Sequence, residues 1–276
     1  MLDIFNWIFN TIFNILFLPF KNIDPVWGML VSSIVTGIVM LFIFKATSDQ
    51  VGIKKAKNLL KGHFLAIRLY RDDISIMFDT MKNILLANLL YMKKSVRPML
   101  FLLVPVVIIL LQLGSRYEFR PFNVGETIVV SLRLDDSSGN LDLDKVQLSL
   151  PEGLRTDMPP VRVKQLREVN WRIKAKEAGI YDLSFKYEGQ VVNKEIHVMD
   201  SLVPVASSVA RDNVTTTLMN PGEASLPGSS IASMVSVTYP RRDFEVLGFN
   251  LHWLVAFFIF SLIAAFSCKG LFGVEV

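Results

Sequence analysis

Few residues of this chain have the types and spacing that covalent chemistry requires. Its three histidines, His63, His197 and His252, fall in three different regions, so we do not expect two of them to share a metal ion. The sequence contains no glycine-rich phosphate loop, no nucleophile elbow and no His-Glu-x-x-His motif. We therefore expect a protein that is not an enzyme and has neither a metal nor a cofactor.

A row of small and hydroxyl side chains stands out within otherwise apolar sequence. Its members recur at about four-residue spacing, and a serine in a later apolar segment joins them: Gly28, Ser32, Ser33, Thr36, Gly37 and Ser261. One interpretation is tight helix packing, because small residues let backbones approach and hydroxyls can bond across helices. The other is a mildly hydrophilic groove open to the cytoplasm, which would lower the cost of moving polar chain through lipid. The two interpretations are compatible.

The composition indicates that these residues belong to a membrane protein. The 276 residues are 51% hydrophobic, and the mean hydropathy of +0.42 is rare for a soluble domain of this size. Three apolar runs explain the value, and each approaches the ~20 residues that cross ~30 Å of hydrocarbon. We predict membrane spans over residues 26–45, 98–114 and 247–268. The single cysteine, Cys268, excludes a disulfide within the chain.

The distribution of charge predicts the orientation. Residues 45–97 carry many more lysines and arginines than aspartates, whereas residues 115–248 are close to balanced. Because lysine and arginine near membrane ends are retained on the cytoplasmic side, we place residues 45–97 inside and 115–248 outside. The N-terminus then lies outside, and residues 269–276 form a cytoplasmic tail. The expected location is a bacterial inner (plasma) membrane.

Residues 1–22 read as an amphipathic helix that lies in the membrane interface. Asn6, Asn10 and Asn14 recur every four residues, after an acidic start at Asp3. The opposite face is apolar and is formed by Ile4, Phe5, Ile8, Ile12, Ile15 and Leu16. A polar stripe opposite large apolar side chains is typical of an interfacial helix. A buried or re-entrant helix is the alternative.

Residues 46–97 show helical periodicity twice, which predicts an antiparallel coiled-coil hairpin on the cytoplasmic side. Asp72 or Asp73 can cap the second helix. A basic patch on the first helix is formed by Lys54, Lys55, Lys57 and Lys61. This patch could contact anionic lipid heads or ribosomal RNA, or it could only set the topology.

The pattern changes to period two after the second span, which predicts an external β-sandwich over residues 118–200. The expected strands are 127–134, 146–151, 169–175, 181–187 and 191–198. The motif from Trp171 to Leu183 looks like the late strands of bacterial immunoglobulin-like domains. Residues 201–246 are rich in Ser, Thr, Ala, Pro and Gly, which favours an extended tether. The stretch 234–239 could return as one more strand.

This order of elements resembles the YidC/Oxa-type membrane insertases. It is similar to their three-span relatives, in which a cytoplasmic coiled coil joins the first two membrane helices. The resemblance rests on topology and on the stripe Asp24-Pro25, Ser32-Ser33 and Thr36. It implies that Ser32, Ser33 and Thr36 line a groove for incoming segments, and that Lys54–Lys61 face the ribosome or the substrate. The chain departs from the family because its first span contains no lysine or arginine and because a β-sandwich precedes its last span.

The predicted fold class is thus an α-helical membrane protein with an inserted all-β, immunoglobulin-like sandwich. The expected function is non-catalytic help in the insertion or assembly of other membrane proteins. The alternative is a structural subunit that anchors an envelope or membrane complex through its sandwich. Expected partners are membrane lipids, other membrane proteins or nascent chains, the ribosome and a periplasmic protein, but not DNA.

Overall fold

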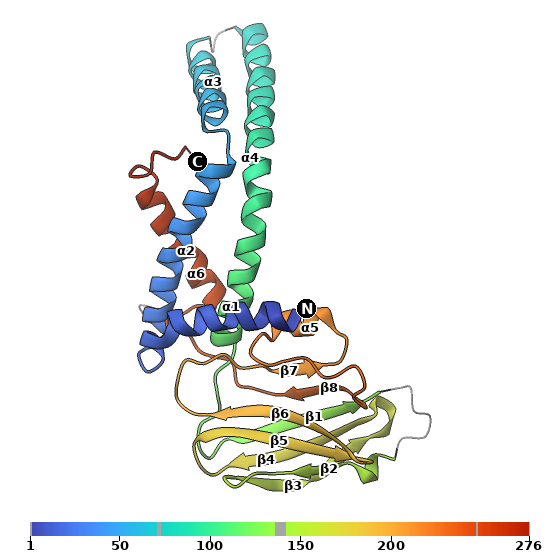
Figure 1. Ribbon diagram of the computed structural model, residues 1–276. Helices are drawn as coiled ribbons and strands as arrows, with labels where there is room; N and C mark the ends of the chain where they lie inside the picture. The colour runs from blue at the N-terminus through green and yellow to red at the C-terminus, as the bar shows by residue number, and fades with distance from the viewer. Residues whose placement is uncertain (1, 71–72, 136–141, 247, 276) are drawn as a thin grey trace. The chain divides into compact units, whose positions relative to one another are not determined.

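The computed structural model describes residues 2–70, 73–135, 142–246 and 248–275. The chain forms two compact units (Figure 1). The first, here called the β-unit, comprises Met1–Gly28 and Ile109–Trp253. The second, here called the helical unit, comprises Met29–Ile108 and Leu254–Val276.

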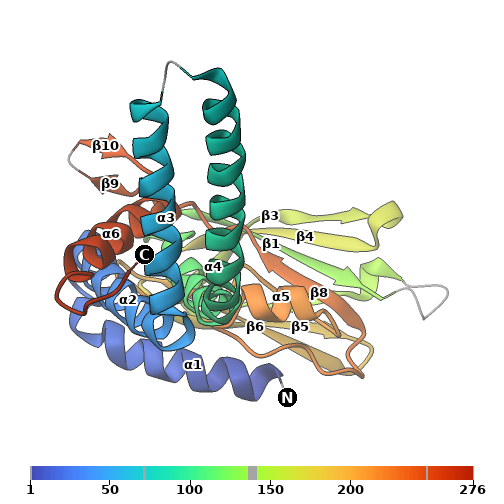
Figure 2. The same ribbon diagram turned by 90° about the horizontal axis from the view of Figure 1, so that it is seen from above.

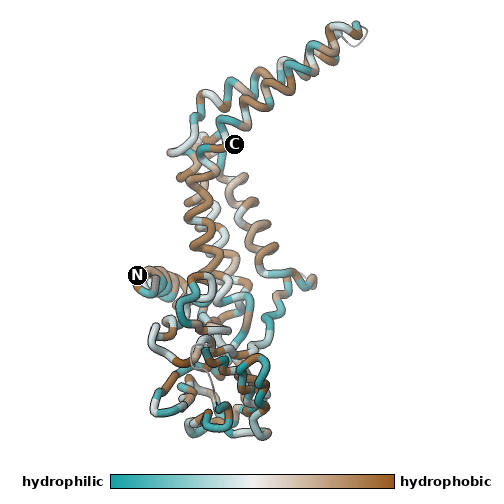
Figure 3. Tube along the Cα trace, turned by 90° about the vertical axis from the view of Figure 1, so that its right-hand side faces the viewer, coloured by the Kyte–Doolittle hydropathy of each residue, from teal (hydrophilic) through white to brown (hydrophobic). Residues whose placement is uncertain are grey.

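Three helical segments in the described part of the chain are long and apolar enough to cross a membrane. They are Asp3–Phe20, Pro25–Thr47 and Ile74–Tyr117, which contain α1 (Leu2–Phe17), α2 (Pro25–Thr47) and α4 (Ile74–Tyr117). Hydrophobic residues dominate α2 and the second half of α4, whereas hydrophilic and hydrophobic residues alternate along residues 50–97 (Figure 3). Three long apolar helices were expected. Two of them match, but the third helix that is long and apolar enough to cross a membrane contains α1, whereas the sequence predicted residues 247–268.

The last apolar helix, α6, is shorter than predicted. It begins at Trp253 and ends at Cys268, which is 16 residues. The residues before it pair as two short strands, β9 (Glu245–Val246) and β10 (Phe249–Asn250). Gly248 makes the tight turn between them with a φ of +82°, a backbone conformation that a glycine adopts without steric cost.

The hairpin is formed by α3 (Gln50–Leu69) and the first part of α4, which lie side by side (Figures 1 and 2). Asp49 accepts a hydrogen bond from the backbone of Gly52 at 2.9 Å, and Asp73 caps α4 through Ser75 at 3.0 Å. Asp72, the other predicted cap, lies outside the described residues. Asp49 also pairs with Lys94 at 2.7 Å, which lowers the pKa of the Asp49 carboxyl.

Helix α4 continues through the predicted boundary between hairpin and span. It contains Pro98 and Pro105 and runs for 44 residues. A proline removes one backbone hydrogen bond, and neighbouring turns can tolerate that loss in an apolar helix. Most of the predicted coiled-coil seam is exposed: Ile53 and Ala56 are buried, whereas its exposed members are Phe64, Tyr70, Ile74, Met81, Leu85, Leu89 and Met92.

Two larger antiparallel sheets lie in the β-unit, besides the two-stranded pair β9–β10. The five-stranded sheet has the order β3-β4-β1-β8-β7, with β1 Thr127–Leu134, β3 Leu154–Val163, β4 Glu168–Ala175, β7 Ser208–Ala210 and β8 Ala232–Val237. The three-stranded sheet has the order β2-β5-β6, with β2 Gln147–Ser149, β5 Gly179–Tyr187 and β6 Gln190–Val198. Four of the five predicted strand segments fall within these elements, whereas only Gln147–Ser149 of the predicted strand 146–151 forms a strand.

The two sheets share one hydrophobic core. Alternate residues of β1, including Ile128, Val130 and Leu132, are buried, as the period-two pattern predicts. Trp171 of β4 meets Phe185 of β5 with ring centroids 5.3 Å apart. A helical region together with a β-rich region is therefore confirmed. The immunoglobulin-like classification stays a prediction.

The structure differs from the predicted tether over residues 201–246. This segment supplies β7, the short helix α5 (Val214–Met219) and β8, and β8 pairs with β1 near the middle of the large sheet. Val205, Val209 and Val235 are buried in the core although Ser and Thr surround them in sequence. β8 overlaps the stretch 234–239, where the sequence indicated one more strand. Its pairing partner lies about 100 residues earlier, and local composition did not reveal that partner.

The sequence also did not predict β3. This strand contains Pro159 and Pro160, which argue against a strand because proline lacks the amide donor. β3 is an edge strand that pairs with β4 alone, with register shifts at Thr156, Met158 and Val161. The free side of an edge strand has no neighbouring strand. A proline there lacks an amide donor, but no other strand loses a hydrogen bond because of it.

We expect Gly153→Ala to destabilise the β-unit. Gly153 has a φ of +96°, and an added Cβ would lie 2.3 Å from the Tyr181 hydroxyl and 2.8 Å from its ring. Gly125→Ala is the matched control, because Gly125 has a φ of +87° but open space around it. We expect about 1–3 kcal/mol lower stability for Gly153→Ala than for the control, measured by thermal unfolding of the purified chain. Equal effects would contradict a role for the clash.

Candidate functional site

The row of small side chains mediates a close helix contact within the helical unit. An added Cβ on Gly37 of α2 would lie 2.5 Å from the backbone oxygen of Ser261 on α6. No side chain fits at that distance, so the two helices approach as closely as they do because residue 37 is glycine. Gly28 plays a similar part in the β-unit, where a Cβ would lie 2.7 Å from the Tyr117 hydroxyl.

Ser32 and Ser33 are turned into the protein. Ser32 Oγ donates to the Met29 carbonyl at 3.0 Å, within its own helix. Ser33 is fully buried, and its Oγ has no hydrogen-bond partner among the described residues. Neither serine lines the groove described next. The resemblance to insertases had implied that both would do so.

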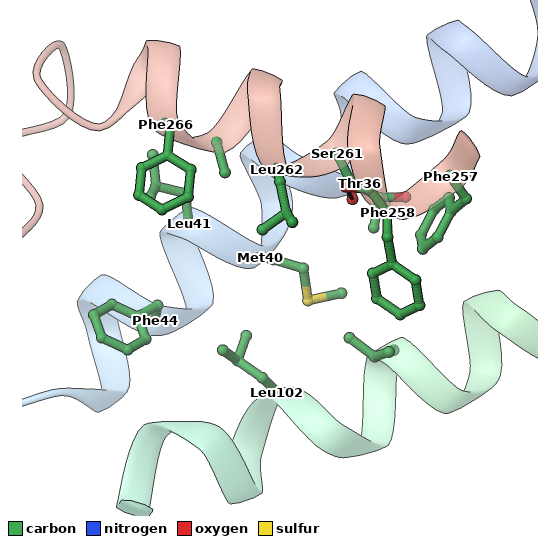
Figure 4. Close-up of a pocket in the computed structure, with 13 residues that line it drawn as sticks. Thr36, Met40, Leu41, Phe44, Leu102, Phe257, Phe258, Ser261, Leu262 and Phe266 are labelled. Carbon is green, nitrogen blue, oxygen red and sulfur yellow. Dashed lines mark hydrogen bonds between the residues drawn. The ribbon is translucent and has the colours of Figure 1, made fainter. Parts of the chain in front are cut away.

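A groove of about 240 Å³ lies between α2, α4 and α6 in the helical unit (Figure 4). Met40 of α2 and Leu102 of α4 face each other across it, and Phe258 and Leu262 project from α6. Thr36 and Ser261 supply the only polar side chains among the residues that line it, and none of those residues is charged. The groove is therefore apolar rather than hydrophilic, and it suits an aliphatic or aromatic side-chain surface.

The predicted basic patch lies on α3 and is partly covered by the C-terminal segment. Lys54, Lys57 and Lys61 recur along one side of the helix and line a shared hollow with Glu275. The Lys57 ammonium lies 3.6 Å from the Glu275 carboxylate, and the Glu275 backbone donates to Gln50 at 2.7 Å. A carboxylate among these lysines reduces their net positive charge, so the patch is weaker than the sequence alone indicates.

The polar stripe of α1 faces the protein, and its apolar face is exposed. Asn6 is buried and donates to the Thr217 carbonyl at 2.7 Å, while Asp3 accepts from Ser225 at 3.1 Å. Trp7 and Ile15 on the other side are about 70% exposed. The sequence predicted the amphipathic pattern correctly, but the stripe binds the β-unit instead of lying free.

Arg116, near the end of α4, lies at the centre of this contact within the β-unit. Its side chain is fully buried, and its guanidinium donates to Asn14 at 2.7 Å and to Asn10 at 3.0 Å. It also donates to the Gln112 backbone and side chain at 2.8 and 3.0 Å, and it stacks on Phe17 at 5.5 Å from the ring centroid. No carboxylate pairs with it among the described residues.

The chain matches no protein-family model, no curated protein and no solved structure. Its function must therefore be argued from its own residues. In the described part of the chain, no group of three or more His, Cys, Asp or Glu side chains could hold a metal ion. His63 lies on α3, His197 on β6 and His252 just before α6.

Arg116 is the residue that the sequence analysis missed. Its signal was the four-residue spacing of Asn6, Asn10 and Asn14, which indicated a continuous polar face and therefore a polar partner. The partner itself stands about 100 residues later in the chain, and single-sequence periodicity cannot identify it. The arginine also sits next to an apolar run, where it resembles an ordinary flanking charge.

We expect Gly37→Ala to loosen the contact between α2 and α6. The added methyl group would meet the Ser261 carbonyl, so the helices must separate or tilt. Gly62→Ala on α3 is the matched control, because nothing lies within 4 Å of its Cβ position. Gly62→Ala should raise helix stability by up to about 1 kcal/mol. Thermal unfolding of the purified chain should show a lower midpoint for Gly37→Ala only, and an unchanged midpoint would contradict the packing role.

Proposed function

We propose that this chain is an integral membrane protein of the bacterial inner membrane that assists the insertion or assembly of other membrane proteins. It does so without covalent chemistry. The observation that carries the proposal is the apolar groove between α2, α4 and α6. In this proposal the three helices cross the bilayer, α3 and the first part of α4 lie in the cytoplasm, and the β-unit's sheets lie outside.

The groove fits a transient apolar client better than a polar one. Its walls are aliphatic and aromatic. The hydroxyls of Thr36 and Ser261 can also accept a hydrogen bond from a client segment. A client helix presenting leucine or valine side chains would bury them there without leaving a charge unpaired. The absence of a charged group among the lining residues distinguishes this groove from the hydrophilic one that the resemblance implied.

The hairpin supplies a second surface for unfolded or partly inserted segments. Large apolar side chains are exposed on both of its helices, including Phe64, Leu65, Phe78 and Leu86. Exposed apolar surface of this kind marks an interaction site in a protein that stays in solution. The neighbouring lysines of the basic patch would favour anionic lipid heads or ribosomal RNA.

The length of α6 is consistent with the same function. Sixteen residues rise about 24 Å, which is less than the ~30 Å of an average hydrocarbon core. A short span is accommodated by local thinning of the bilayer or by tilting of its neighbours. Thinner hydrocarbon beside the groove would lower the cost of passing polar chain across it.

The second candidate is a structural subunit of a fixed complex, held through the external sheets. The observation that favours it is the edge strand β3, which pairs with β4 on one side only and where Met158 and Val161 are more than half exposed. The close contact of Gly37 with Ser261 is compatible with both functions, because either one needs well-packed helices.

Site-specific photo-crosslinking in native membranes tests the proposal. A probe at Met40 faces the groove, and a control probe at Ile263 lies on α6 outside the groove and is 60% exposed. We expect many transient adducts from Met40 that disappear when translation stops, and few from Ile263. One stable adduct of fixed mass that persists without translation would instead identify a subunit of a permanent complex.

A variant that fills the groove gives a second measurement. Leu102→Trp adds bulk at the groove wall, and Ile263→Trp adds the same bulk on the exposed side of α6. We expect Leu102→Trp to reduce the yield of Met40 adducts severalfold while the chain itself accumulates normally. Equal yields from both variants would contradict the groove as the client site.

A further inference from the structure

A second cavity, of about 360 Å³, lies within the β-unit between α1, the end of α4 and the strand β6. Its polar walls are formed by Asn10, Asn14, Lys21, Arg116, Glu195 and His197. The proposed function uses none of these residues. They come from three separate segments of the chain, so the cavity exists only in the folded β-unit.

The charge of this cavity is not balanced. Arg116 and Lys21 contribute two positive charges, and neither has an ion pair among the described residues. Glu195 is the one carboxylate in the wall, and it already binds His197 Nε2 at 2.7 Å. That hydrogen bond lowers the pKa of the Glu195 carboxyl, so the carboxylate stays ionised and one positive charge remains in excess.

Hydrogen-bond donors in the wall are also without partners. Asn10 and Asn14 use their oxygens on Arg116, which leaves both amide nitrogens free of hydrogen bonds among the described residues. Both terminal nitrogens of the Arg116 guanidinium already donate to neutral oxygens. Arg116 would therefore attract an anionic ligand by its positive charge and not by a direct hydrogen bond. Lys21 and the two amides would make the direct contacts.

The surroundings indicate what kind of anion fits. Leu18 lines the cavity and is 72% exposed, and it continues the exposed apolar face of α1 that includes Trp7 and Ile15. A helix with such a face lies at the level of lipid head groups, with its apolar side towards the acyl chains. A phosphate group has several acceptor oxygens and can accept from spread donors at once.

We propose that this cavity binds the phosphate of an anionic phospholipid head group, with Lys21 as its principal contact and Arg116 as the charge behind it. The lipid source of the phosphate rests on the proposed membrane location. The chemistry of the site does not, because inorganic phosphate would satisfy the same donors.

The test uses the full chain purified in a neutral detergent. Native mass spectrometry counts bound dioleoyl-phosphatidylglycerol as the lipid is titrated, and calorimetric titration measures inorganic phosphate. Lys21→Gln removes the exposed charge with no burden on folding, and Lys176→Gln removes an exposed lysine that lies elsewhere in the β-unit. Gly222→Leu reduces the cavity without changing any charge, since a Cβ there has no neighbour closer than 3.6 Å.

We expect one tightly retained phosphatidylglycerol on the wild type and on Lys176→Gln. Its affinity should fall about tenfold in Lys21→Gln, as expected for one charge-assisted hydrogen bond, and also in Gly222→Leu. Binding of inorganic phosphate without the lipid, with the same dependence on Lys21, would overturn the lipid source and support the phosphate site. If neither probe binds, or if both variants bind as the wild type does, the proposal fails. The assay needs no translation, so its result is independent of the crosslinking test.

Discussion

The arrangement of the β-unit depends on burying the guanidinium of Arg116. An isolated cation costs several kcal/mol to remove from water, so it requires a full set of acceptors at close range. Gln112, one turn earlier on α4, supplies two of them, and Asn10 and Asn14 supply two more from the other end of the sequence. The asparagine stripe of α1 must therefore face inward, and its apolar face must be exposed. The exposed face follows from this one contact, and the cavity lined by Arg116, Asn10 and Asn14 lies beside it.

The contact between α2 and α6 in the helical unit obeys a different constraint, because these two helices contain a single charged residue, Lys45. Close packing replaces ionic contact there, and Gly37 permits it by letting α2 approach the Ser261 carbonyl. The same approach leaves space on the side of α4, where side chains as large as Met40 and Leu102 do not close the gap. The same helices therefore form both the close contact at Gly37 and the groove beside it. The packing interpretation of the small-residue row fits this arrangement, whereas the groove beside it is apolar and differs from the hydrophilic groove of the second interpretation.

The places where the structure differs from the sequence analysis have one physical origin. Residues 201–246 look like a tether because they are rich in Ser, Thr, Ala, Pro and Gly, yet β8 is held by a partner strand far away in the chain. The strand β3 contains two prolines, which an edge position tolerates. Helix α4 continues through Pro98 although a local rule would break it there. In each case a tertiary neighbour outweighs a local preference of the backbone.

The sequence by itself determined the features that depend on neighbours a few residues apart. These are the apolar helices, the period-two strands β1, β4, β5 and β6, a helix cap at Asp72 or Asp73 and the amphipathic pattern of α1. Tertiary structure alone decided what each pattern contacts: the stripe of α1 binds Arg116, Glu275 lies among the lysines of α3, and Ser32 and Ser33 face away from the groove. Periodicity records which face of an element is polar or small. The partner of that face is set by the folding of distant segments together, and no local pattern encodes it.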